Sequence, residues 1–299
     1  VTDPKTHKIG VVGVGRPDDP LYVLSMRHMS TKILEAGKRA QFTDAERDHK
    51  RGLDFGALNC GVFFGHGPTE PYNLLNGARE PLLNELLADE DVIRVAAFQS
   101  GTSFRIFVPK LYKRTWRATC ATAVRDLKWN FRKSVFSAAA FNFGPQTVTA
   151  RHRDCMNLPG GFCAITALGE FNSKTGGHLV IEELGIVIEF PAGSTILLPS
   201  AVFTHSNTAI QPGETRVSFT QYTSGALFRY ADNGYRTEAG LKAYNEDQYD
   251  DMLKRKSTRW NDTLKLWSTL EEVLKCAKLK CTGTGEVESD DFVAPTSSI

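Results

Sequence analysis

Two histidines and one aspartate stand at a spacing typical of a mononuclear iron site. His152 and Asp154 are separated by one residue, and His205 follows after a gap of 50 residues. Two imidazoles and one carboxylate form the facial triad that binds non-haem Fe(II) and leaves coordination positions open. These residue types therefore indicate a reaction at the metal, beyond metal binding alone.

An arginine and a serine follow the distal histidine. Arg216 stands 11 positions after His205, and Ser218 comes two residues later, on the same face of an extended segment. The planar guanidinium fork matches a carboxylate bidentately, which a lysine does not reproduce. We therefore expect Arg216, with the Ser218 hydroxyl as a further donor, to bind a carboxylate-bearing co-substrate beside the metal.

Other functional interpretations of short motifs compete with this one. The His-Arg-Asp triplet is shared with the kinase catalytic loop, but Pro159 stands where that loop needs an asparagine. Gly13 and Gly15 begin like a dinucleotide-binding loop, but the third glycine is missing and Pro17 interrupts the helix that should follow. A non-catalytic, cupin-like metal site stays open, although such a site would not need Arg216.

The segment from 134 to 221 has the pattern of an antiparallel β core. Short β-branched and aromatic runs alternate there with glycine, proline and asparagine turns, which indicates seven or eight strands. Such strands predict an antiparallel barrel or a double-sheet jelly roll. The expected strands are 135–143, 147–150, 161–167, 178–181, 186–190, 194–198, 204–207 and 214–222.

This layout places the candidate metal ligands at comparable positions. His152 and Asp154 follow directly on an expected strand, and alternation along an extended chain points both side chains to one side. His205 lies on another short strand, after Pro199. We therefore expect the three side chains to converge inside one mouth of the barrel.

Helical periodicity flanks this core and gives an α+β fold class. We expect one strand at 8–14, helices at 21–40, 80–128 (interrupted by Pro109), 237–249 and 260–277, and a short helix capped by Thr43 or Asp44. The expected organisation is a mostly helical part (1–133), a β core (134–230), C-terminal helices (231–281) and a disordered acidic tail (282–299).

Composition bounds the class of protein. The 299 residues are 41% hydrophobic and 23% charged, without an apolar run near 18 residues, which is typical of a soluble globular protein without a membrane segment. The chain begins with Val1, so we expect an N-terminal region to be missing, and no leader argues for secretion. The six cysteines are scattered, so we expect reduced thiols and no structural zinc.

Positive charge is concentrated in one stretch, although the net charge is only +2. Between 104 and 134 nine lysines and arginines face the single acid Asp126. Such a run is most often a solvated helix face, and its alternative is a surface that contacts nucleic-acid phosphates.

The segment from about 136 to 222 resembles the core of the TET/JBP family of Fe(II)- and 2-oxoglutarate-dependent dioxygenases, most closely its fungal, basidiomycete-type members. The resemblance covers roughly a third of the chain. The matching stretches are 140–147 (Ala-Phe-Asn-Phe-Gly-Pro-Gln-Thr), 152–157 (His-Arg-Asp-Cys-Met-Asn), 176–180 (Gly-Gly-His-Leu-Val), 192–194 (Ala-Gly-Ser), His205 and 216–218 (Arg-Val-Ser).

This resemblance implies a double-stranded β-helix core, Fe(II) on the His152, Asp154 and His205 triad, and 2-oxoglutarate held by Arg216 with Ser218. With O2 as co-substrate, it implies oxidation of a methylated base flipped out of duplex DNA. It further implies that Asn157 meets the Watson–Crick edge of this base and that Tyr222 packs on its ring.

Three departures from the family pattern affect the substrate. Ser224 stands where TET enzymes carry a histidine that contacts cytosine, Met156 replaces another histidine, and the Cys-rich zinc-binding region is absent. The Asn157 amide satisfies the hydrogen-bonding edge of cytosine or of adenine. Both 5-methylcytosine oxidation and N6-methyladenine demethylation therefore stay open.

Two alternative functions remain. One is a 2-oxoglutarate oxygenase of the same fold that acts on a protein or a small molecule, and the other is an inactive, transposon-derived DNA-binding module. The intact triad argues against the inactive module. For the DNA dioxygenase we expect a nuclear monomer.

Overall fold

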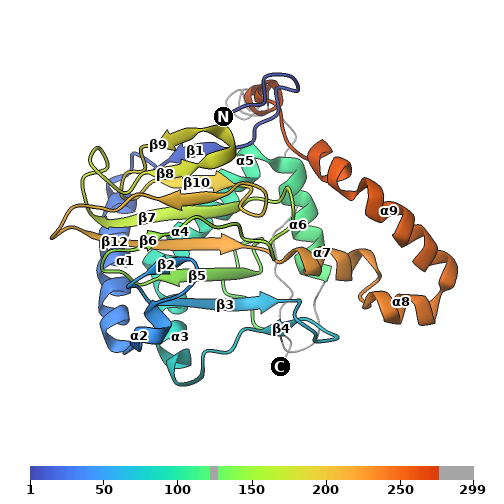
Figure 1. Cartoon of the computed structure of the whole chain (residues 1–299), viewed down its shortest axis with the longest axis horizontal. Coiled ribbons are helices and arrows are strands. Elements are labelled where there is room, and N and C mark those ends of the chain that lie inside the picture. Colours follow the sequence, from blue (N-terminus) through green and yellow to red (C-terminus); the bar gives the residue numbers. More distant parts are fainter. Residues whose placement is uncertain (122–126, 276–299) are drawn as a thin grey trace.

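Seven antiparallel strands form the main sheet, and their order brings distant parts of the chain together (Figure 1). The computed structural model describes residues 1–121 and 127–275. In spatial order the strands are β1 (Val12–Gly15), β10 (Thr195–Leu198), β7 (Cys163–Glu170), β12 (Thr215–Tyr222), β5 (Ala138–Asn142), β3 (Ala57–Phe63) and β4 (Tyr72–Asn73).

Shorter strands complete the β core. Side chains of the main sheet and of the three-stranded sheet line one shared cavity, so the two sheets enclose a space between them. The predicted α+β class with a double-stranded β-helix (jelly-roll) core is confirmed. The shorter strands are β11 (His205–Asn207), β8 (Leu179–Ile181) and β9 (Ile186–Ile188) in the three-stranded sheet, and β2 (Gly52–Leu53) with β6 (Val148–Thr149).

Helices cover the other face of the main sheet. Met29 and Ile33 of α1 belong to one buried cluster with Val217 and Phe219 of β12. Because side chains alternate along a strand, Ser218, which lies between Val217 and Phe219, faces the enclosed space between the two sheets instead. The helices of this N-terminal part are α1 (Pro20–Arg39), α2 (Asp44–Arg47), η1 (Gly77–Arg79), α3 (Glu80–Ala88), α4 (Glu90–Ala97), the π-helical turn η2 (Phe98–Phe104), α5 (Arg105–Phe107) and α6 (Pro109–Ala121).

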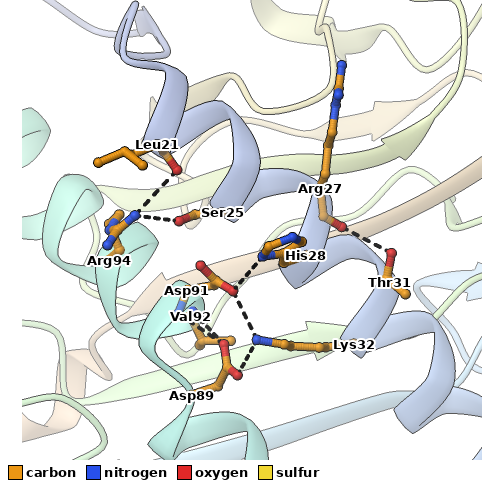
Figure 2. A network of polar contacts seen from close by, with 10 residues as sticks. All are labelled: Leu21, Ser25, Arg27, His28, Thr31, Lys32, Asp89, Asp91, Val92 and Arg94. Atoms are coloured by element: carbon orange, nitrogen blue, oxygen red, sulfur yellow. Dashed lines mark hydrogen bonds and ion pairs between the residues drawn. The ribbon is translucent and has the colours of Figure 1, made fainter.

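A polar network fastens α1 to the start of α4 (Figure 2). The Asp89 side chain accepts hydrogen bonds from the first backbone N–H groups of α4, as an N-cap does. Lys32 of α1 pairs with both Asp89 and Asp91, and His28 lies 3.4 Å from Asp91. The network fixes where α4 rests on α1, and thereby how both helices sit on the sheet.

Three predicted helices are wrong in their boundaries. The helix expected over 80–128 breaks at Asp89, where the backbone is extended (ψ 131°), and residues 127 and 128 are not helical. The helix expected over 237–249 breaks at Asn245, where the backbone is extended (φ −159°) and the side chain accepts from the Gln248 N–H. Asn245 therefore caps a new helix, which runs through the expected gap to Lys265. Three helices follow β12, namely α7 (Gly225–Asp232), α8 (Glu238–Tyr244) and α9 (Glu246–Lys265), and α8 and α9 extend away from the β core (Figure 1).

The helix expected over 260–277 is interrupted, because α9 ends at Lys265 and residues 266–269 are not helical. The end of this expected helix and the acidic tail at 282–299 lie outside the described residues. None of the helices in the described part of the chain is long and apolar enough to cross a membrane.

The N-terminal part supplies strands to the core sheet. The strand expected over 8–14 appears as β1, and β3 was not expected at all. β3 pairs with β5 over five residues, from Ala57 opposite Asn142 to Gly61 opposite Ala138. The predicted boundary at 133 stays a prediction, but one wall of the core comes from residues before it.

Candidate functional site

Backbone pairing places the three candidate metal ligands together. His152 and His205 exchange two hydrogen bonds of 3.0 Å, one in each direction, and the Asp154 N–H donates to the Ser200 carbonyl at 2.9 Å. The two imidazole ring centres are therefore 4.3 Å apart. The ligand atoms of His152, Asp154 and His205 all lie within 4.8 Å of one another.

Both imidazoles are oriented by carbonyl oxygens behind them. His152 Nδ1 lies 2.7 Å from the Ala150 carbonyl, and His205 Nδ1 lies 2.9 Å from the Phe203 carbonyl. With Nδ1 as the donor, each ring keeps the lone pair of Nε2 for a metal. Burial, and then the neighbouring ring of His205, hold the pKa of His152 below its usual value, which favours the neutral form that a metal needs.

The carboxylate of Asp154 lacks a full set of partners. Its Oδ1 is buried and has no hydrogen-bond partner among the described residues. It lies 4.0 Å from His152 Nε2 and forms an ion pair with Arg51 Nη2 at 3.1 Å. A buried carboxylate oxygen without a hydrogen bond is costly unless a cation binds it. The two imidazole Nε2 atoms and this oxygen fit Fe(II).

Arg216 lines the cavity, and no acidic side chain of the described residues pairs with it. Its side chain is on β12 and the residue is 3% exposed; Nη1 donates to the Thr147 carbonyl at 3.0 Å, and Nε has no partner within the described chain. Burial lowers the pKa of Arg216 to about 10. Ser218, two residues on, accepts a hydrogen bond of 2.8 Å from the Asn142 amide. A guanidinium with an unused donor beside a buried hydroxyl fits a carboxylate of 2-oxoglutarate.

One cavity of about 660 Å³ joins all seven predicted site residues. This volume lies within the range of small-molecule sites in proteins. The predicted residues in its wall are His152, Asp154 and His205, then Arg216 and Ser218, and finally Asn157 and Tyr222.

The two predicted substrate residues already have protein partners. The Asn157 amide nitrogen donates to Ser200 Oγ at 3.0 Å, and the Tyr222 hydroxyl donates to Asn59 Oδ1 at 3.0 Å. Burial raises the pKa of Tyr222, so its hydroxyl stays protonated. Among the described residues, no group donates a hydrogen bond to the Asn157 side-chain oxygen, so this oxygen can accept one from a ligand.

Ser224 has a structural position. It is fully buried, its hydroxyl donates to the Phe64 carbonyl at 2.6 Å, and it is not among the residues that line the cavity. The serine therefore holds the end of β3 and does not offer a side chain to a ligand.

Part of the cavity wall was missed by sequence reasoning. It comes from the loop before β2 and from the β3–β4 hairpin, and includes two histidines. No periodicity marked these segments, since β3 contains a glycine and a polar asparagine. The missed lining residues are His49, Lys50, Arg51, Asn59, Phe63, His66 and Tyr72.

Two residues of the basic run between 104 and 134 form ion pairs with acidic side chains that do not line the cavity. Lys110 pairs with Glu272, and Arg114 pairs with Asp232. Within the described residues, no lysine or arginine of this run lines the cavity. Exposed cations at the cavity are Lys50 and Arg51, from the loop before β2.

A glutamate outside the cavity joins the two segments that carry the metal ligands. Glu183 accepts hydrogen bonds of 2.7 Å from the Thr204 backbone N–H and from the Thr204 hydroxyl, and it pairs with Arg153. Arg153 stands between two ligands, and Thr204 directly precedes His205. Burial raises the pKa of Glu183, but the hydrogen bonds from Thr204 and the ion pair with Arg153 outweigh this effect and bring the pKa down to about 2.

We expect Glu183→Ala to weaken iron binding by about 10-fold or more, as loss of an outer partner of a metal ligand does. The pKa of Glu183 in the folded protein lies below its usual 4.5. Its contribution to the stability of the fold is therefore present above pH 4.5 and is lost as the pH falls towards 2. Titration with Mn(II) and thermal unfolding across pH measure both effects. Glu182→Ala is the control, since Glu182 pairs only with Arg151; equal effects of the two substitutions would contradict the role of Glu183.

Comparison with solved structures finds a protein of similar fold. Over 73% of each chain, the protein superimposes on NgTET1 in complex with 5mC DNA with a TM-score of 0.52 at 12% sequence identity. This chain shares the fold of NgTET1. Weaker similarities are a Pseudomonas putida prolyl-4-hydroxylase (TM-score 0.37, 16% identity, 73% of this chain and 93% of that one) and OsALKBH1 (0.37, 10%, 72% and 98%). The sequence matches no protein-family model and is not detectably similar to a curated protein.

The donor set at the cavity fits both predicted cofactors. Fe(II) fits the two imidazoles and the carboxylate whose Oδ1 lacks a hydrogen bond, and 2-oxoglutarate fits the buried guanidinium. Both predicted cofactors are therefore supported by residues of this chain.

Proposed function

We propose that this protein is an Fe(II)- and 2-oxoglutarate-dependent dioxygenase that oxidises the methyl group of a methylated base in DNA. The observation that carries the proposal is a single cavity lined by a metal triad, a buried arginine without an acidic partner in the described chain, an amide and an aromatic ring. The triad and Arg216 support the oxygenase reaction. Asn157 and Tyr222 support a planar, hydrogen-bonding substrate.

Each residue has a defined task in this proposal. Together, the bound iron and 2-oxoglutarate supply the chemistry that activates O2 and removes a methyl hydrogen. His152 and His205 present their Nε2 lone pairs, and Asp154 supplies the carboxylate. Arg216 binds and orients the far carboxylate of the co-substrate, which fixes its reacting end towards the triad.

Several features favour a nucleic-acid substrate. The free acceptor of Asn157 suits the exocyclic amine of a base, and the Tyr222 ring offers an apolar contact. Lys50 lines the same cavity and suits a phosphate beside a flipped base, whose extrusion from the helix needs compensating contacts; Arg51 lines it too but is paired with Asp154. NgTET1, which shares the fold, was solved with 5mC DNA. A genomic substrate would place this protein in the nucleus.

The proposal is tested by incubating the protein with Fe(II), 2-oxoglutarate and duplexes that carry 5-methylcytosine or N6-methyladenine. Mass spectrometry of the nucleosides is expected to show hydroxymethylcytosine and its higher oxidation products, or unmethylated adenine with formaldehyde. Unchanged methyl bases in both duplexes, together with succinate formed in the absence of DNA, would mean an oxygenase with another substrate.

Asn157→Ala is expected to lower methyl-base oxidation by roughly 5- to 100-fold, because a base then leaves a buried hydrogen-bonding group unsatisfied. Uncoupled succinate formation should change little, since Asn157 contacts neither the candidate metal nor Arg216. Ser200→Ala is the matched control, because it removes only the hydroxyl that holds the amide. Equal losses in coupled and uncoupled turnover would assign Asn157 to the fold or to the iron.

A further inference from the structure

Three aromatic side chains of the β3–β4 hairpin stand in a row along the cavity wall. The His66 ring is stacked on Phe63 with an interplanar angle of 13° and ring centres 5.9 Å apart. Tyr72 meets Phe63 edge-on, with ring centres 6.1 Å apart. All three side chains line the cavity, and His66 is the exposed member.

The backbone at His66 is strained. His66 has a φ of +60°, and its neighbours Gly65 and Gly67 have φ values of +141° and +107°. Side-chain-bearing residues rarely adopt this left-handed region, and such strain is concentrated at functional sites. A third glycine would fit this backbone without strain, so the fold does not require an imidazole there.

The hairpin is held firmly against the rest of the site. The Ser224 hydroxyl fixes the Phe64 carbonyl, and the Leu74 N–H donates to the Gly61 carbonyl at 2.9 Å. A Cβ atom at Gly65 would lie 2.8 Å from the Cε of Met156, so the hairpin rests on the segment between Asp154 and Asn157. The position of His66 is therefore fixed relative to the candidate metal and substrate residues.

We infer that His66, backed by Phe63, is a stacking platform for the methylated base as it enters the cavity. The proposal rests on the proposed function. One face of the imidazole is covered by Phe63, and the exposed ring stands at a cavity wall that also carries Lys50 and Arg51. A flat heteroaromatic ring next to a phosphate matches this combination. Stacking on His66 would hold the base outside the helix before Asn157 and Tyr222 receive it.

The experiment measures binding without oxygen, so that it does not depend on turnover. Fluorescence anisotropy follows duplexes carrying 5-methylcytosine or N6-methyladenine, and 2-aminopurine beside the methylated base reports extrusion. His66→Ala is expected to weaken binding roughly 5- to 100-fold, the range for one base on one aromatic ring, and to reduce the 2-aminopurine signal. His66→Phe should restore most of both.

Tyr235→Ala is the matched control. Tyr235 is also an aromatic residue with positive φ (+62°), it is 44% exposed and packs edge-on against Tyr230, but it does not line the cavity. His66→Gly should unfold at the same temperature as the wild type or at a higher one, because the strain is removed, yet bind as weakly as His66→Ala.

The outcomes separate the two proposals. Unchanged affinity in His66→Ala, or an equal loss in Tyr235→Ala, would overturn the platform even if the wild type oxidises methylated bases. A loss of affinity for methylated duplexes without a loss for methylated single strands would also overturn it. His66 would then occupy the space that the base leaves in the duplex and would not contact the base itself. Absence of oxidation by the wild type would overturn the proposed function alone.

Discussion

Asp154→Ala is expected to abolish 2-oxoglutarate turnover and to weaken metal binding more than any other single substitution in this protein. The carboxylate is the only anionic member of the triad, and its buried Oδ1 has no hydrogen-bond partner in the described chain. Loss of an outer partner of a metal ligand costs about 10- to 100-fold in affinity, so loss of the ligand itself should exceed 100-fold. Both coupled methyl oxidation and uncoupled succinate formation should disappear.

Mn(II) titration measures the affinity independently of turnover, and thermal unfolding without metal checks that the variant folds. Asp154→Ala should then unfold close to the wild type, because the substitution removes a buried oxygen without a hydrogen bond together with its ion pair to the half-exposed Arg51. Asp262→Ala is the control, since Asp262 lies on exposed α9 and pairs with Lys265. Retained turnover in Asp154→Ala would mean that the triad is misassigned.

Arg216→Met is expected to raise the KM for 2-oxoglutarate by about 30-fold or more, because truncating one partner of a buried charge pair costs about 2–5 kcal/mol. The same substitution should stabilise the cofactor-free protein. Burial disfavours the charged form of Arg216 and lowers its pKa from the usual 12.5 to about 10. At neutral pH the side chain is charged in both states, so its burial destabilises the folded protein in full.

Thermal unfolding with and without 2-oxoglutarate distinguishes these effects. The co-substrate should raise the unfolding temperature of the wild type and leave that of Arg216→Met unchanged. Arg216→Lys should recover little, because an ammonium does not reproduce the bidentate fork. The control is Arg229→Met, since burial also lowers the pKa of Arg229 but its side chain does not line the cavity. A wild-type KM in Arg216→Met would place the co-substrate elsewhere.

The β core was predictable because its strands are short, alternating and separated by turn residues. The placement of the metal and co-substrate candidates was predictable for a related reason: it follows from spacing within or between neighbouring strands. Asn157 and Tyr222 were expected only from the family resemblance, and the roles of all seven residues stay predictions. His152 and Asp154 share one extended segment, and Arg216 and Ser218 share another. Local geometry alone therefore brings each pair to one face.

The remaining cavity wall depends on long-range pairing, which a single sequence does not display. β3 contains Asn59, Cys60 and Gly61, so its alternation is broken, yet it is fixed by β5 on one side and β4 on the other. His66 has no periodic neighbours and lies on a left-handed turn. The helix break at Asn245 was missed because the polar residues of α9 carry little periodicity, whereas the capping side chain decides where the helix begins.

The order of strands in the main sheet has a consequence for how the protein acquires its metal. Val12 pairs with Leu197, and Cys60 pairs with Ala139, which is 79 residues away. Pairings this distant in sequence form slowly, because a long loop must close before the contact is made. A growing chain would have no complete cavity until β12 has left the ribosome, so iron loading should follow synthesis. Iron starvation during expression should therefore be reversible by adding Fe(II) to the folded protein.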